Sequence, residues 1–318
     1  MRRILFSLAA LTVLLAPGCG TTGPSFTVDF PFFYLQDVDC GNTPTVCAFM
    51  SDGGDGLACA GSDLYFLDHG QGYVLAKVDL GVPLSCCTAS SEGGFAAAAS
   101  GLQFFYVSDE TYAEHDPILL DAPASFLLTK PYGTVIYAVC ADGSVSTVST
   151  VGTQWSQISN DPTGVGQPSA AAITSDGSVI FVADAADSTI KALDPSGFGT
   201  LAEAYVGCPV ADMCASPAGG AFAAPSDLPE VWHLDQSTGL HDYTVGLPGT
   251  PECIAVTPDA QYIFAGCTGH GIVVVDMQGE IQAQTGSYGQ PSDIAVSGDG
   301  QRALYCSPDL MKLLMVSR

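Results

Sequence analysis

Basic residues are scarce in this 318-residue chain. It contains 8 Lys and Arg against 33 Asp and Glu, which gives a formal net charge of −25. A surface with this charge repels phosphate backbones and anionic lipid headgroups. We therefore exclude nucleic acid as a partner, and we also exclude membrane binding through a basic surface.

Long helical and membrane-spanning patterns are also missing. After residue 18, no run of 18 uninterrupted apolar residues occurs, and no segment keeps apolar residues at every third or fourth position over ten residues. At the same time, 47% of the residues are hydrophobic, which is far above the level of disordered chains. We therefore expect a globular β protein with a sizeable core.

Common catalytic motifs are absent. The sequence has no His-Glu-x-x-His, no Gly-x-Ser-x-Gly and no glycine loop for phosphate, and its five histidines are spread along the chain. Its 12 cysteines include no Cys-x-x-Cys pair. So many cysteines without a metal-binding spacing favour an oxidising compartment.

The first residues form an export signal. A basic start is followed by an apolar run over residues 4–15 and by small residues up to Gly18. The Gly18-Cys19 junction resembles the lipobox of bacterial lipoproteins, which implies cleavage after residue 18 and a lipid on Cys19. The alternative is an ordinary secretory signal with an incidental cysteine. A polar tether, residues 20–25, follows Cys19.

The rest of the chain, residues 26–318, is built from seven copies of a repeat. Each copy begins at a proline that precedes a short apolar run, and the copies are about 40 residues long. The prolines are Pro44, Pro83, Pro123, Pro168, Pro209, Pro251 and Pro291.

Each copy contains four short segments of apolar residues separated by turn residues. In the sixth copy they are 253–257, 262–265, 272–275 and 280–285. Four strands in about 40 residues is typical of a β-propeller blade. The aspartates that end several third strands are best interpreted as turn formers. We therefore predict an all-β, seven-bladed β-propeller with four-stranded antiparallel blades.

The copies resemble the YVTN-type β-propeller repeat family, whose pattern is roughly G-x-P-x-x-I-A-V-S-P-D-G followed by two apolar strands. Residues 290–300 and the strands 303–306 and 180–184 carry this resemblance. It implies a propeller fold but leaves the function open, since the family includes binding modules and enzymes.

The seventh copy stops after three strands. The apolar segment Phe32-Phe33-Tyr34-Leu35 lies just before the first copy, where a fourth strand would end. We expect this N-terminal segment to provide the missing outer strand of the last blade and so to close the ring.

The cysteines suggest two disulfides. Counted from the proline of each copy, Cys47 and Cys59 lie symmetrically about one hairpin, and Cys253 and Cys267 do the same. Residues directly opposite in an antiparallel pair approach closely enough for an S–S bond. The alternatives are buried free thiols or, less favoured, a zinc site.

Three carboxylates fall at nearly equivalent places in consecutive copies. Asp212, Glu252 and Asp293 lie at the starts of inner strands, near the axial channel. Together they could bind Ca²⁺ through oxygen ligands. The alternative is that they line a wet acidic channel, with no cofactor.

The sequence thus predicts an exported, lipid-anchored β-propeller of the bacterial cell envelope. We expect it to act as a binding or scaffold module for a protein or small-molecule ligand, with no catalytic residues. A metal-dependent hydrolase or lactonase at the channel mouth is the alternative.

Overall fold

The computed structural model describes residues 27–28, 33–50, 55–68, 72–91, 94–152, 154–285, 289 and 291–317. The secondary structure of these residues consists of 29 β-strands. Within this part of the chain, no helix is long and apolar enough to cross a membrane. The predicted signal peptide, Cys19 and the tether lie outside the described residues.

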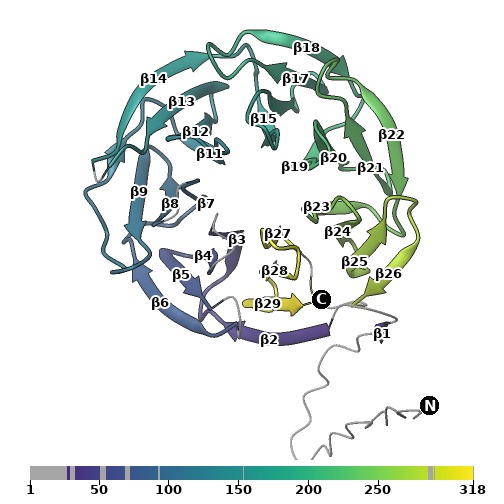
Figure 1. Ribbon diagram of the computed structural model, residues 1–318, viewed down its shortest axis with the longest axis horizontal. Coiled ribbons are helices and arrows are strands. Elements are labelled where there is room, and N and C mark those ends of the chain that lie inside the picture. Colours follow the sequence, from purple (N-terminus) through teal and green to yellow (C-terminus); the bar gives the residue numbers. More distant parts are fainter. Residues whose placement is uncertain are drawn as a thin grey trace, which may run out of the picture.

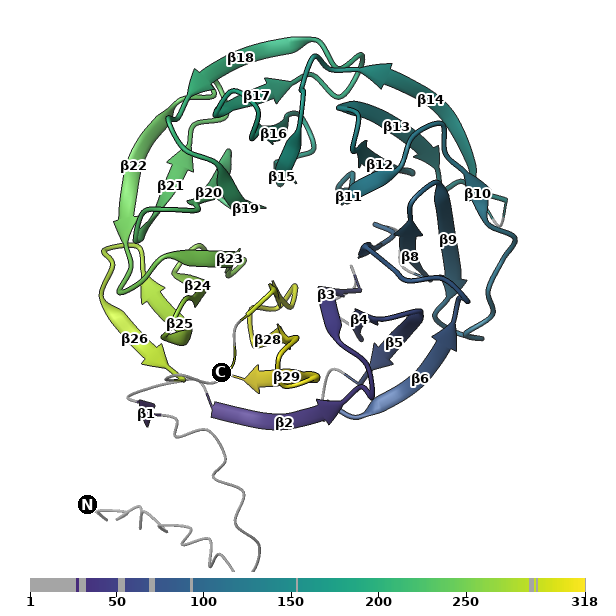
Figure 2. The same cartoon turned by 180° about the vertical axis from the view of Figure 1, so that it is seen from behind.

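The strands form seven sheets that surround a central axis (Figures 1 and 2). Each sheet is a blade of antiparallel strands, and in six blades the strands follow chain order from the axis to the rim. The predicted seven-bladed propeller is therefore confirmed.

The first three blades occupy the N-terminal half of the chain. Blade 1 contains β3 (Pro44–Phe49), β4 (Gly56–Ala60), β5 (Asp63–Leu67) and β6 (Val74–Asp79). Blade 2 contains β7 (Cys86–Ala89), β8 (Phe95–Ser100), β9 (Gln103–Ser108) and β10 (Ile118–Leu119). Blade 3 contains β11 (Ala124–Thr129), β12 (Val135–Cys140), β13 (Ser144–Ser149) and β14 (Ser156–Pro162).

The remaining blades complete the ring. Blade 4 contains β15 (Pro168–Ile173), β16 (Ile180–Asp184), β17 (Thr189–Leu193) and β18 (Thr200–Tyr205). Blade 5 contains β19 (Val210–Ala215), β20 (Ala221–Pro225), β21 (Glu230–Leu234) and β22 (His241–Gly246). Blade 6 contains β23 (Pro251–Val256), β24 (Tyr262–Cys267), β25 (Gly271–Asp276) and β26 (Ile281–Gln284). Blade 7 contains β27 (Asp293–Val296), β28 (Arg302–Ser307) and β29 (Lys312–Ser317), together with β2 (Phe33–Asp39).

The middle strands of the blades are buried on both faces. Every residue of β16 and β17 is buried, because their two faces pack against neighbouring blades. The outer strand β18 has no buried residue. This difference explains why middle strands such as β16 and β25 are nearly continuous apolar runs, whereas the rim strands carry more polar residues.

Short side-chain hydrogen bonds fix the turns. Asp194, Asp235 and Asp276 each accept a backbone N–H from two residues further on, at 2.8–3.0 Å. These contacts confirm that aspartates ending third strands are turn formers.

The ring closes through the N-terminal strand. β2 pairs with β29 in a register that runs from Phe33 opposite Ser317 to Asp39 opposite Lys312. The predicted closure is confirmed, and the strand extends further along the chain than residues 32–35. A second short strand, β1 (Thr27–Val28), pairs with β26 and adds a fifth strand to blade 6.

Candidate functional site

A cavity of about 320 Å³ lies where the inner strands meet at the axis. All seven blades contribute to its wall. The lining residues are Val46, Cys47, Ser85, Cys86, Cys87, Ser125, Phe126, Leu127, Leu128, Ala171, Ala211, Asp212, Met213, Glu252, Ser292 and Asp293. The wall is thus apolar on the side of blade 3 and carries carboxylates on the side of blades 5 to 7.

Irregular pairing near the start of the inner strands sets which side chains line this cavity. In blades 1, 3, 4, 5 and 6 the register between the first and second strands shifts at one residue. Such a β-bulge bends the strand and redirects its side chains. In blade 5 the shift lies between Val210 and Asp212, and Asp212 is then paired opposite Ala224.

Asp212 connects blade 5 to blade 6. The N–H of Met213 donates to Asp212 Oδ1, and the N–H of Ile254 in blade 6 donates to Asp212 Oδ2, both at 2.7 Å. Burial raises the pKa of Asp212 to about 6, and these two N–H donors oppose that increase.

Asp293 makes the same connection between blade 7 and blade 1. The N–H of Ile294 donates to Asp293 Oδ1 at 2.9 Å, and the N–H of Cys47 in blade 1 donates to Oδ2 at 2.7 Å. Burial raises the pKa of Asp293 to about 8, and the Asp212 carboxylate across the cavity adds to the increase.

The two carboxyl groups therefore differ in charge at neutral pH. A pKa of about 6 leaves Asp212 mostly ionised at pH 7, and a pKa of about 8 leaves Asp293 mostly protonated. Asp212 and Asp293 together thus carry roughly one negative charge, and the wall of the cavity, which also includes Glu252, has no basic side chain. Chemically, this arrangement suits a ligand with a positive charge or with several hydrogen-bond donors.

Glu252 does not join the other two acids as a metal ligand. It is the extra residue of the bulge in β23, between Pro251 and Cys253, and Glu252 Oε1 accepts a 2.7 Å hydrogen bond from the Thr268 hydroxyl. Among the described residues, no group of three or more His, Cys, Asp or Glu side chains is arranged to hold a metal ion. The three acids predicted as calcium ligands line one cavity but are not grouped as a metal site in this part of the chain: Glu252 is bonded to Thr268 of its own blade, and the other two carboxyl groups accept backbone N–H groups.

The cysteines of the two predicted disulfides do not lie opposite one another in their hairpins. The bulge in β3 places Val46 opposite Cys59 and leaves Cys47 opposite Ala58. The bulge in β23 likewise places Pro251 opposite Cys267 and Cys253 opposite Gly266. All four cysteines are free thiols in the structure. The geometric argument for the disulfides Cys47–Cys59 and Cys253–Cys267 is therefore wrong by one residue in each hairpin.

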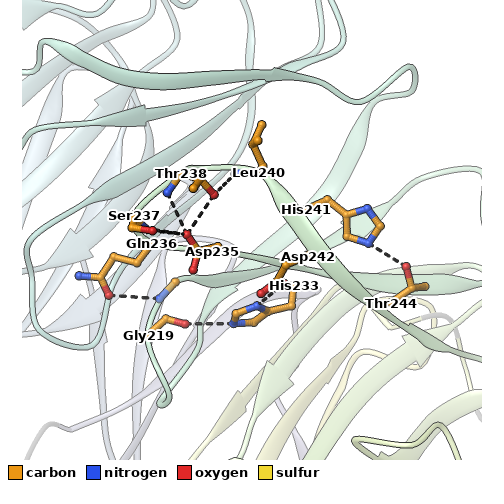
Figure 3. A network of polar contacts seen from close by, with 11 residues as sticks. Gly219, His233, Asp235, Gln236, Ser237, Thr238, Leu240, His241, Asp242 and Thr244 are labelled. Atoms are coloured by element: carbon orange, nitrogen blue, oxygen red, sulfur yellow. Dashed lines mark hydrogen bonds and ion pairs between the residues drawn. The ribbon is translucent and has the colours of Figure 1, made fainter.

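A second polar cluster lies in blade 5 and was not predicted (Figure 3). His233 Nδ1 lies 2.7 Å from Asp242 Oδ1, and His233 Nε2 lies 3.0 Å from the Gly219 carbonyl oxygen. The ring of His233 also stacks on Tyr243, with ring centroids 4.6 Å apart. Because both ring nitrogens interact with groups of the same blade, we interpret His233 as a structural residue that stabilises blade 5. The sequence gives no sign of it, since Asp242 is brought close only by the pairing of β21 with β22.

The comparisons with known proteins identify the fold alone. No protein-family model matches the chain, and no curated protein is similar to it in sequence. The resemblance to the YVTN-type family therefore stays a prediction.

Two solved structures are similar to the chain over most of its length. Hydrazine synthase from Kuenenia stuttgartiensis has a TM-score of 0.74 and 14% identity, with 88% of this chain and 97% of that chain covered. The β-propeller domain of Cps50 (Swd1) from Myceliophteria thermophila has a TM-score of 0.76 and 10% identity, with 91% of this chain and 100% of that chain covered. At these identities the likeness supports the propeller fold.

Proposed function

We propose that the protein is an exported binding module, rather than an enzyme, whose axial cavity takes a positively charged group. The observation that carries this proposal is the placement of Asp212 and Asp293, from two different blades, in one cavity at the axis. A cation between the two carboxyl groups would offset the burial and the repulsion from Asp212, which together raise the pKa of Asp293.

The apolar part of the wall indicates the rest of the ligand. Phe126, Leu128 and Met213 line the same cavity as the two carboxyl groups. An aliphatic chain that ends in an ammonium group fits both surfaces, whether it belongs to a small amine or to a lysine side chain of a partner protein. The net charge of −25 would also draw cations toward the protein.

We further propose that Cys19 carries a lipid that holds the propeller at the membrane of the bacterial cell envelope. The apolar run, the Gly18-Cys19 junction and the polar tether support this anchor. Membrane attachment would then involve the lipid and not the acidic propeller surface.

Calorimetric titration with n-butylammonium tests the binding site. We expect saturable binding to the wild type, and at least a tenfold weaker affinity in Asp212→Asn, because removing one partner of a desolvated charge pair costs about 2 kcal/mol or more. Glu203→Gln, on the exposed face of β18, is the matched control and should bind as the wild type does.

The pH dependence of the binding affinity provides a second test of the site. Binding should strengthen as the pH rises from 5 to 8, since Asp212 and then Asp293 lose their protons over this range. Equal affinities for the wild type and Asp212→Asn, or an affinity that NaCl at matched ionic strength abolishes in both, would refute the site.

A further inference from the structure

Two pairs of thiols lie across the interfaces that blade 1 forms with its neighbours. Cys47 on β3 faces blade 7, and Cys59 on β4 faces blade 2. Each of them meets a cysteine of the neighbouring blade: Cys306 on β28 and Cys87 on β7. All four side chains are buried.

Several contacts place Cys47 beside Cys306. The Cys47 thiol lies 3.6 Å from the carbonyl oxygen of Leu304, which is on the same strand as Cys306. Cys47, Leu304 and Cys306 belong to one buried cluster. Each of the two thiols also affects the pKa of the other, after the larger effect of burial. The backbone N–H of Cys47 is also held by Asp293 of blade 7, so the two blades are fixed at this level.

The second pair has the same kind of support. The Cys87 thiol lies 4.0 Å from the carbonyl oxygen of Val46, and Val46 is the cross-strand partner of Cys59. Cys59 and Cys87 belong to one buried cluster, and the neighbouring Cys87 thiol and burial raise the pKa of Cys59. The adjacent Cys86 packs instead into the cluster between blades 2 and 3, so only Cys87 of this vicinal pair faces blade 1.

We propose that Cys47–Cys306 and Cys59–Cys87 are sites of inter-blade disulfide formation when the exported chain folds with a low-molecular-weight disulfide as oxidant. In each pair one thiolate attacks the external disulfide, gives a mixed disulfide and releases one external thiol. The second cysteine then attacks the mixed disulfide and releases the other external thiol. Each cross-link therefore oxidises two cysteines and reduces one external disulfide, and the structure shows the reduced form of both pairs.

Burial decides when this exchange can occur. Burial raises the pKa of the Cys47 thiol to about 12, and it raises that of Cys306 as well. Because the thiolate is the reacting form, exchange in the folded protein is slow, and the bonds form while the chain is still folding. The same burial then protects a completed bond from reductants.

The first cross-link has a special place in the ring. Blade 7 and blade 1 are the last and first blades of the chain, and the strand β2 closes the ring at the rim through hydrogen bonds to β29. A Cys47–Cys306 bond would join the same two blades covalently near the axis. The ring would then be closed at both its inner and outer edges.

Oxidative refolding with peptide mapping tests the proposal. The mature wild-type chain is unfolded, reduced and refolded in a glutathione redox buffer, and its free thiols are alkylated before digestion without reductant. We expect two cross-linked peptide pairs, 47 with 306 and 59 with 87, and an intact mass lower by the four hydrogens that two disulfides lose. We also expect the thermal midpoint to exceed that of the reduced protein by about 10 °C, because the cross-links restrict the unfolded chain.

Two variants separate the proposed pair from general oxidation. Cys306→Ser should lose the 47–306 link alone, whereas Cys267→Ser, a buried cysteine of blade 6, should keep both links. If Cys306→Ser does not fold, the peptide map of the refolded wild type still tests the proposal. Alkylated Cys47 and Cys306 in the folded product, or Cys47 linked to Cys59, would overturn the proposal. These outcomes do not depend on ligand binding.

Discussion

The stability of the propeller should fall as the pH rises from 5 to 9, and Asp293 should be the main cause. Burial raises the pKa of Asp293 from the usual 3.8 to about 8, so the native protein keeps a proton that the unfolded chain has released. For a carboxyl group whose pKa is raised in the native state, the stabilisation is greatest below the pKa of the unfolded chain. It is lost as the pH rises through the native pKa.

The magnitude follows from the two carboxyl groups of the cavity. A pKa difference of one corresponds to about 1.4 kcal/mol, so between pH 5 and 9 ionisation of Asp293 removes about 4 kcal/mol, and ionisation of Asp212 removes about 1 kcal/mol. Folding stability is about 5–15 kcal/mol for most domains. The loss is therefore large enough to move a urea midpoint strongly.

The substitution Asp293→Asn removes the ionisation but keeps the size of the side chain. At pH 5 we expect the variant to be less stable than the wild type by about 1–3 kcal/mol, since an amide leaves one of the Cys47 and Ile294 N–H groups without an acceptor. At pH 9 it should be the more stable protein, because it has no charge to bury. The two curves of stability against pH should cross.

Urea unfolding at pH 5 to 9, followed by intrinsic fluorescence, measures both curves. Asp176→Asn is the control: hydrogen bonds from Thr174 and Gln236 lower the pKa of Asp176, so its stability contribution is complete above pH 5 and falls only in acid. This variant should run parallel to the wild type from pH 5 to 9. If Asp293→Asn also runs parallel to the wild type, the carboxyl group is not buried as described and the reasoning fails.

Two further predictions concern the N-terminal part of the chain. Deleting residues 33–39 uncovers β29 and removes buried Val38, so we expect aggregation and a lower thermal midpoint; a soluble product with an unchanged midpoint would contradict the closure by β2. Replacing Cys19 by Ala should release the protein from the membrane fraction of cells, as should globomycin treatment, and unchanged fractionation after the substitution would rule out the anchor.

The repeat made the architecture predictable from the sequence. Short apolar runs and their turn residues are local signals, and seven copies of them reinforce one another. The missing fourth strand of the last copy then left one place for the apolar N-terminal segment. The seven blades and their closure by β2 follow from this reasoning.

The candidate site was predictable in part, because one-residue irregularities are invisible in such a pattern. Asp212, Glu252 and Asp293 do line one cavity, as their places in the repeat indicated. Glu252, however, is the extra residue of a bulge, and the structural equivalent of Asp212 in blade 6 is Cys253. The same kind of bulge displaced the cysteine pairing. Contacts between different blades, such as Cys47 with Cys306, depend on how the sheets pack. They therefore produce no characteristic residue spacing that could be recognised in the sequence.

The closure of blade 7 by β2 also determines the order in which the fold can be completed during synthesis. β2 is the first strand of this blade to leave the ribosome, whereas its partner β29 follows the strands of the six other blades. Their pairing joins two strands that the six other blades separate in the sequence, and such distant contacts form slowly. Blades 1 to 6 can each assemble as they emerge, but the ring stays open until β29 has emerged. Premature termination anywhere upstream would therefore leave a gapped ring with an unpaired first strand, a form that proteases can distinguish from the finished protein.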